Sequence, residues 1–156
     1  MTVIKAIDGG LASGIVYWGT DSQTIILAEQ VEDGVLGVAE EFECERFYHT
    51  LVAETFKLNA GNKFLADLST VEVNGWLKGQ ALWEKGVAPN VHKTFNRLGE
   101  KDPKAQSPIT RLMKEQGVPI GAGHVRDALS IAIHYACTKL KDRATLETHK
   151  RLMKGK

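Results

Sequence analysis

The stretch that most constrains the fold covers residues 121–141, because its apolar side chains recur at the three- and four-residue spacing of a packed α-helix. One stripe of this expected helix is wholly apolar and consists of Val125, Ala128, Leu129, Ala132, Ile133, Ala136 and Leu140. At steps of three, four and three residues, a second stripe carries His124, Asp127, Ile131 and His134. We expect the helix to bury one face and to present His124 and Asp127 together at its start.

An acid in the first turn of a helix also has a purely structural explanation, since the helix dipole stabilises negative charge at that end. A functional interpretation of His124 and Asp127 therefore requires further acids that could meet them in space. Upstream, the chain offers two, Asp8 and Glu54, each inside or at the end of an apolar run.

Length and composition favour one soluble globular domain, since the chain has 156 residues of which 43% are hydrophobic and 25% charged. No apolar run approaches the roughly 18 residues of a membrane span, and the N-terminus lacks a secretion-signal pattern. We expect no membrane partner and a cytoplasmic location. Cys44 and Cys137 lie in helical patterns without metal-ligand spacing, which favours reduced packing residues over a disulfide or a zinc site.

Charge is distributed unevenly along the chain, although the net charge is only +1. Residues 1–50 carry two basic and nine acidic side chains, whereas residues 51–156 carry 18 and 10. The basic part indicates a polyanionic partner, although basic C-terminal segments are also common as solvated surface.

Three short apolar runs at the N-terminus predict consecutive antiparallel strands over residues 3–7, 14–18 and 25–28. Asp8 ends the first run and precedes Gly9 and Gly10, which would let a ligand or another backbone come close. The same tripeptide is also an ordinary turn sequence.

Residues 34–48 have helical spacing and an acidic face, which we interpret as solvent-facing rather than as a metal cluster. Residues 50–56 return to strand composition and include Glu54 in an otherwise apolar segment. A carboxylate there must be paired, bound to metal, or placed at a strand end that faces a cleft.

The remaining segments alternate between helix and loop patterns. We expect a helix over residues 68–85 and a short edge strand over residues 88–95, because Pro89 is excluded from the centre of a sheet. Residues 96–108 have the composition of a loop. A Ser-Pro start predicts a further helix over residues 107–116.

Three of these segments resemble motifs of the RuvC-type Holliday junction resolvases, which belong to the ribonuclease H-like superfamily. The opening I-D-G-G-L is similar to the family's first acidic motif, although Gly9 stands where Pro is usual, and V-A-E-T-F resembles the strand that bears its Glu. The best match is H-V-R-D-A-L-S-I-A-I-H, in which His124 takes a position that is Asp in many members and His in others.

The resemblance implies an α/β fold of the ribonuclease H-like type, with a five-stranded mixed sheet whose first three strands are antiparallel and which is flanked by helices. On this basis we expect a nuclease domain over residues 1–142 and a basic C-terminal helical tail over residues 143–156. The resemblance also implies a homodimer that cuts two symmetry-related DNA strands. Short forms of the family occur in bacteriophages.

The expected site consists of oxygen and imidazole ligands from distant parts of the chain. Hard divalent cations prefer carboxylate oxygens, and two of them about 3.5–4 Å apart can clamp a phosphodiester under attack. We expect two Mg²⁺ ions, for which Mn²⁺ could substitute, to be held by Asp8, Glu54, His124 and Asp127. By resemblance, Lys93 and Lys104 act near the scissile phosphate.

The expected partner is a four-way DNA junction. By resemblance Phe56 would stack on a base, although an aromatic residue in a strand is more often part of the core, which is the interpretation we favour. We expect the DNA contacts to come from Phe56, Lys78, Lys93, Arg97, Lys101, Lys104, Arg111 and Lys114.

Three alternatives stay open. The chain could bind branched DNA or act as a scaffold without cutting, because a neutral His124 gives the site one negative charge less than a fourth acid. It could instead cut RNA in RNA–DNA hybrids. A phosphate-binding ATPase is the weakest alternative, because 156 residues leave no room for the second domain of such a fold.

Overall fold

The computed structural model describes residues 2–43, 50–55, 68–80, 85–98, 106–121 and 123–155. A five-stranded mixed sheet in the order β3-β2-β1-β4-β5 forms the centre of the molecule. Its strands are β1 Val3–Asp8, β2 Ser13–Gly19, β3 Thr24–Val31, β4 Thr50–Glu54 and β5 Lys85–Val87. The first three strands pair antiparallel, and β4 runs parallel to both β1 and β5, so the predicted sheet is confirmed.

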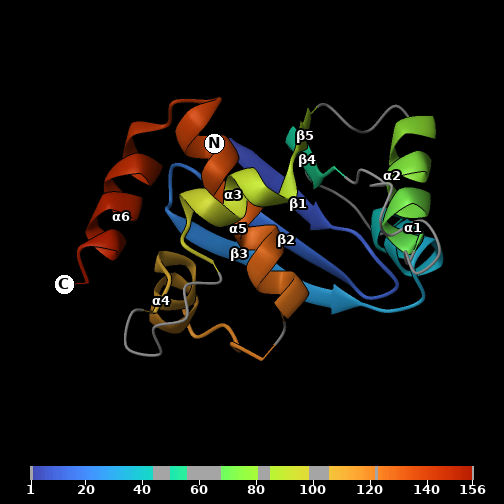
Figure 1. Ribbon diagram of the computed structural model, residues 1–156, viewed down its shortest axis with the longest axis horizontal. Helices are drawn as coiled ribbons and strands as arrows, with labels where there is room; N and C mark the ends of the chain where they lie inside the picture. The colour runs from blue at the N-terminus through green and yellow to red at the C-terminus, as the bar shows by residue number, and fades with distance from the viewer. Residues whose placement is uncertain are drawn as a thin grey trace.

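Helices cover both faces of this sheet (Figure 1). They are α1 Val35–Glu43, α2 Ser69–Gly79, α3 Pro89–Phe95, α4 Pro108–Glu115, α5 Gly123–Thr138 and α6 Arg143–Met153. Alternate β1 residues enter two separate cores: Ile4 and Ala6 pack toward α4, α5 and α6, while Val3 and Ile7 pack toward α1 and α2. Because both faces are covered, every residue of β1 is buried.

Helix α5 lies at the centre of the larger core, against β1 and β2 and in contact with α3, α4 and α6. The prediction of a single buried face was wrong, since every residue from 128 to 137 is buried, Ile131 and His134 included. A helix surrounded by a sheet and three other helices has no solvent face along that length. The helix ends at Thr138, and Leu140 beyond it is exposed.

The predicted edge strand over residues 88–95 was also wrong. The edge strand closest to this segment in sequence is β5, which ends at Val87, and Pro89 begins the short helix α3. Proline suits the first position of a helix because the N–H that it lacks would have no intrahelical partner there. Lys93 therefore lies on a helix in contact with α5 instead of on a sheet edge.

The two C-terminal helices begin at side-chain caps. Ser107 accepts a hydrogen bond from the backbone N–H of Thr110 and is followed by Pro108, as the sequence predicts for α4. Asp142 caps α6 in the same way, and this helix packs on α4 and α5 with Leu152 buried. The expected tail is thus a docked helix, while the division of the chain at residue 142 stays a prediction.

Two smaller expectations concern packing and membranes. Cys137 is a buried free thiol whose pKa is raised by burial to about 12, which agrees with a packing role; Cys44 lies outside the described residues. Within the described ranges, no helix is long and apolar enough to cross a membrane.

Candidate active site at the ends of β1, β4 and α5

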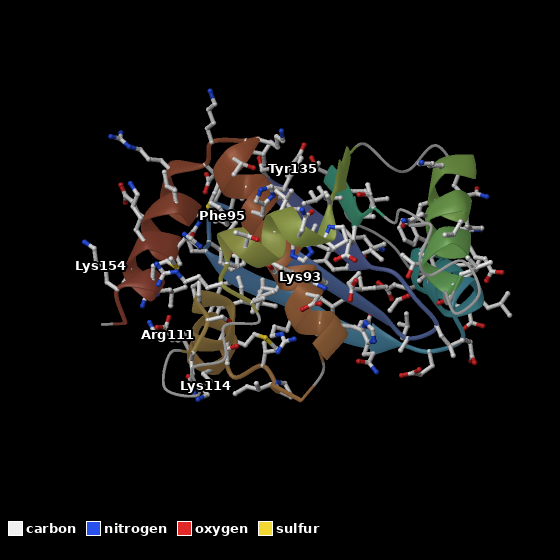
Figure 2. All side chains as sticks on the ribbon, in the orientation of Figure 1. Lys93, Phe95, Arg111, Lys114, Tyr135 and Lys154 are labelled. Carbon is white, nitrogen blue, oxygen red and sulfur yellow. The ribbon has the colours of Figure 1, made fainter. Side chains whose placement is uncertain are left out.

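An open cleft of about 720 Å³ lies at the C-terminal end of β1. The turn after β1, the start of α5 and Lys93 of α3 contribute to its walls, together with Asp8, His124 and Asp127. Lys93 lies where α3 passes over α5 (Figure 2). Four of the predicted site residues therefore meet at one cleft.

Gly14 of β2 allows the start of α5 to approach the sheet this closely. A Cβ atom at this position would overlap the backbone carbonyl of His124. The sequence thus places the first turn of α5 directly against β2, beside the end of β1 that carries Asp8.

Asp8 and His124 form the first contact within the cleft, with 2.9 Å between Asp8 Oδ2 and His124 Nδ1. Burial raises the pKa of Asp8 to about 6, although the hydrogen bond to His124 lowers it. The negative charges of Glu54 and Asp127 add to the increase. Glu54 and Asp127 therefore lie close enough to Asp8 to disfavour its ionised form.

Lys93 supplies positive charge to two of these acids. Its Nζ lies 3.0 Å from Asp127 Oδ2 and 3.9 Å from Glu54 Oε2. Burial lowers the pKa of Lys93, but the hydrogen bond to Asp127 and the charges of all three acids outweigh it, so that the pKa is raised overall. The side chain is held as an ammonium ion.

Glu54 is held from behind by a residue that the sequence analysis did not single out. His92 is fully buried, and its Nε2 lies 2.7 Å from Glu54 Oε2. In a strand, residues 92 and 93 would face opposite sides, whereas on α3 both reach Glu54. The contact could not be predicted while residues 88–95 were interpreted as a strand. Glu54 itself, unlike Lys93, does not line the cleft.

The donor chemistry of this site suits a hard divalent cation, because it brings three carboxylates and one imidazole together. In the arrangement observed, however, no three His, Cys, Asp or Glu side chains of the described residues are placed to hold a single ion. The ammonium of Lys93 provides the positive charge that the acids require. The residues fit a divalent metal in the chemistry of their donor atoms.

The predicted DNA-binding residues are spread over several elements. Lys78 lies exposed on α2, on the other face of the sheet from α3 and α4, and Arg97 lies exposed just after α3. Arg111 and Lys114 both lie on α4 (Figure 2), where Arg111 donates a hydrogen bond to the carbonyl of Leu152. Phe56, Lys101 and Lys104 lie outside the described residues.

The fold has close counterparts among solved structures. A Thermus thermophilus RuvC structure matches with a TM-score of 0.56 at 15% sequence identity, over 90% of this chain and 98% of that one. T. thermophilus RuvC in complex with a Holliday junction substrate matches with the same TM-score at 18% identity, over 87% and 93%. No family model and no curated protein sequence matches the chain.

The matches span almost the full length of this chain and of the RuvC chains. At this low sequence identity they show the fold alone. The chain has a RuvC-like fold of the ribonuclease H-like type, as predicted.

Proposed function

We propose that the protein is a metal-dependent endonuclease that resolves four-way DNA junctions by paired, symmetric nicks, leaving 5′-phosphate and 3′-hydroxyl ends. The observation that carries this proposal is the meeting of Asp8, Glu54 and Asp127 near one open cleft of a RuvC-like fold. Acids brought together from two strand ends and a helix, at a cost to the ionisation of Asp8, are typical of a functional site.

In this proposal Asp8, Glu54, Asp127 and His124 hold two Mg²⁺ ions, or Mn²⁺ in their place. Bound divalent cations would lower the pKa of an attacking water and stabilise the leaving oxygen. His124 orients Asp8 through a hydrogen bond. Lys93 neutralises the negative charges of Asp127 and Glu54 until a phosphate or cation enters. Lys104 is proposed to act beside Lys93.

The proposed partner is branched DNA, bound by a homodimer in the cytoplasm. The RuvC structure that holds a Holliday junction substrate supports a junction as the ligand, because its fold is shared over nearly the whole chain. A dimer would present two clefts related by a two-fold axis, which matches the symmetry of a junction. The remaining basic residues would bind phosphates without reading sequence.

A second candidate is a module that binds branched DNA without cutting it. It is favoured by the pairing of each acid with a nitrogen group, His124, His92 or Lys93, and by the placement of the described residues, no three of which could hold one ion. A ribonuclease H-like nuclease that acts on RNA–DNA hybrids would use the same ligands and differ only in substrate.

Replacing Asp127 by Asn tests the ligand set of the proposed nuclease. The amide keeps the shape of the side chain and loses the charge that retains a cation, so cleavage of a labelled junction in Mg²⁺ should fall at least about 100-fold while junction binding persists. Asp33→Asn, at an exposed position that does not itself line the cleft, is the matched control. Junction cleavage by Asp127→Asn at the parent's rate would refute the proposed ligand set.

A further inference from the structure

His92 has hydrogen-bond partners on both sides although it has no contact with solvent. Its Nε2 lies 2.7 Å from Glu54 Oε2 on β4, and its Nδ1 lies 2.9 Å from Ser130 Oγ in the buried middle of α5. A ring engaged at both nitrogens has only one orientation in its pocket. His92 therefore links the acid of the second strand motif to the central helix.

The neighbours of His92 determine which of its nitrogens carries the proton. Asn96 Nδ2 donates to Ser130 Oγ at 2.8 Å and to the carbonyl of Ser130 at 3.0 Å. Ser130 Oγ lies 2.9 Å from His92 Nδ1 and donates to the carbonyl of His92 at 3.3 Å. Because an ionised carboxylate can only accept, the hydrogen between His92 and Glu54 belongs to Nε2 and points at Glu54. The chain Asn96, Ser130, His92 thus ends in a donor aimed at one carboxylate oxygen.

The main chain of Glu54 is fixed independently. Asn74 Nδ2 of α2 donates to the carbonyl oxygen of Glu54 at 2.9 Å. Glu54 is therefore held through its backbone from one side of the sheet and through its carboxylate from the other. Such double anchoring is more than packing requires of an acid at a strand end, and it restricts the carboxylate to one direction.

We propose that His92 is a positioning residue: its Nε2–H holds Oε2 of Glu54 and so presents Oε1 for a divalent cation. The inference rests on the proposed function, because it assigns a role in preparing that site. Carboxylates that bind metals are themselves hydrogen-bonded as a rule, and loss of such a partner lowers metal affinity or activity about 10- to 100-fold. His92 directly precedes Lys93 in the sequence, and Lys93 lines the cleft.

Two amide substitutions separate the two ring nitrogens. His92→Gln places an N–H donor near the position of Nε2, whereas His92→Asn places one near Nδ1 and removes the N–H that Glu54 accepts from residue 92. His149→Asn is the matched control, because it removes a buried histidine that lies on α6. Ser130→Ala removes the hydroxyl group beside His92 Nδ1 and keeps the imidazole. It replaces His92→Asn if that variant does not fold.

The first readout is Mn²⁺ binding to the metal-free full chain by titration calorimetry, with the melting temperature of each variant. The second is kcat and KM on a four-way junction. We expect His92→Asn to weaken Mn²⁺ binding about 10- to 100-fold and to lower kcat with KM nearly unchanged, and Ser130→Ala to weaken binding by a smaller factor. His92→Gln should stay within about threefold of the parent in both, and His149→Asn should lower only the melting temperature.

Parent-like Mn²⁺ affinity in His92→Asn or Ser130→Ala, or equal losses in the Gln and Asn variants, would overturn the positioning role. If the Mn²⁺ affinities follow the expected order but the parent cuts no junction, the proposed nuclease function fails and the role of His92 stands. A parent that binds no Mn²⁺ overturns both.

Discussion

The buried carboxyl group of Asp8 lowers the stability of the metal-free fold at neutral pH. Its pKa is raised from 3.8 to about 6, mainly by burial, so the folded protein favours the protonated form more than the unfolded chain does. The resulting stabilisation is complete below about pH 4 and is lost as the pH rises through about 6. At pH 7 the ionised carboxylate therefore destabilises the metal-free fold.

Asp8→Asn should accordingly stabilise the metal-free protein while abolishing cleavage. A difference of about two pKa units corresponds to at most about 3 kcal/mol of unfolding free energy at pH 7. The gain should disappear at pH 4, where Asp8 is protonated in the parent. Urea denaturation in excess chelator at both pH values measures it.

Asp33→Asn is the control for this prediction, because Asp33 is exposed in a left-handed turn that Asn also tolerates. Its effect should remain within about 0.5 kcal/mol at either pH. Equal changes in unfolding free energy in the two variants would show that the cleft does not disfavour the ionised form of Asp8.

Single residues were predictable from the sequence where their chemistry was out of place in the local pattern. Glu54 in an apolar run and Asp8 before two glycines stood out for that reason, and the structure brings both to one site. His92 did not stand out, because its partner Glu54 is 38 residues away and its helix was interpreted as a strand. Only the tertiary fold brings it to Glu54.

At the scale of secondary-structure elements, the approach of α5 to β2 decides whether His124 meets Asp8. Gly14→Ala should force the first turn of α5 outward, since the added methyl group would overlap the backbone of His124 and Val125. We expect a loss of about 1–3 kcal/mol in stability, as for an overpacked core, together with loss of cleavage.

Gly75→Ala is the matched control for Gly14→Ala. No atom lies within 4 Å of the added methyl group, and Gly75 is inside α2. This variant should be neutral or up to about 1 kcal/mol more stable, because alanine favours a helix. Parent-like stability and cleavage in Gly14→Ala would contradict the assigned role of the close approach.

Helices α3, α5 and α6 meet at a cluster of three aromatic rings. Phe95 of α3 stacks on His149 of α6 at 4.5 Å and packs edge-on against His134 of α5 at 5.2 Å, measured between ring centroids. Burial lowers the pKa of both histidines, and electrostatic interactions of His134 with His92 and Lys139, and of His149 with Arg97, lower the pKa further. The folded protein therefore favours the neutral rings.

The stability that this cluster contributes should be present above about pH 6.5 and be lost as the pH falls below it, by at most about 1.4 kcal/mol per pH unit for each histidine. His149→Phe removes one of the two titrating groups. The unfolding free energy of the parent should thus fall relative to that of His149→Phe between pH 7.5 and pH 5.5, by urea denaturation. Asp8 titrates in both proteins, so its contribution cancels, and parallel pH profiles would rule out the effect.

Elements were predictable where the hydrophobic period and the turn chemistry agreed, as for the three N-terminal strands and the Ser107 cap of α4. The interpretation failed where one residue supports two structures: Pro89 is suited both to an edge strand and to the first turn of a helix. The full burial of α5 also escaped prediction, because its small and polar residues, such as Ser130, are buried only through the packing of α3, α4 and α6.

At the scale of the whole molecule, the fold separates two functions of charge. The acids and Lys93 gather at or beside one cleft, whereas the other described cations that were predicted to bind DNA lie on α2, just after α3 and on α4. The cleft alone cannot select a four-way junction over a duplex. Selection by shape requires two clefts held at a fixed spacing. The proposed dimer would supply them.

The most direct test of the central claim is cleavage of a labelled mobile four-way junction by the purified full chain, with and without Mg²⁺, followed by treatment with a ligase. We expect no cleavage in excess chelator, cleavage in Mg²⁺, and paired nicks that the ligase reseals because they carry 5′-phosphate and 3′-hydroxyl ends at symmetric positions. Cutting that persists in chelator would contradict the metal-dependent mechanism, and cutting confined to RNA–DNA hybrids would contradict the proposed substrate. Tight junction binding with no cleavage in Mg²⁺ or Mn²⁺ would instead establish the non-cleaving alternative.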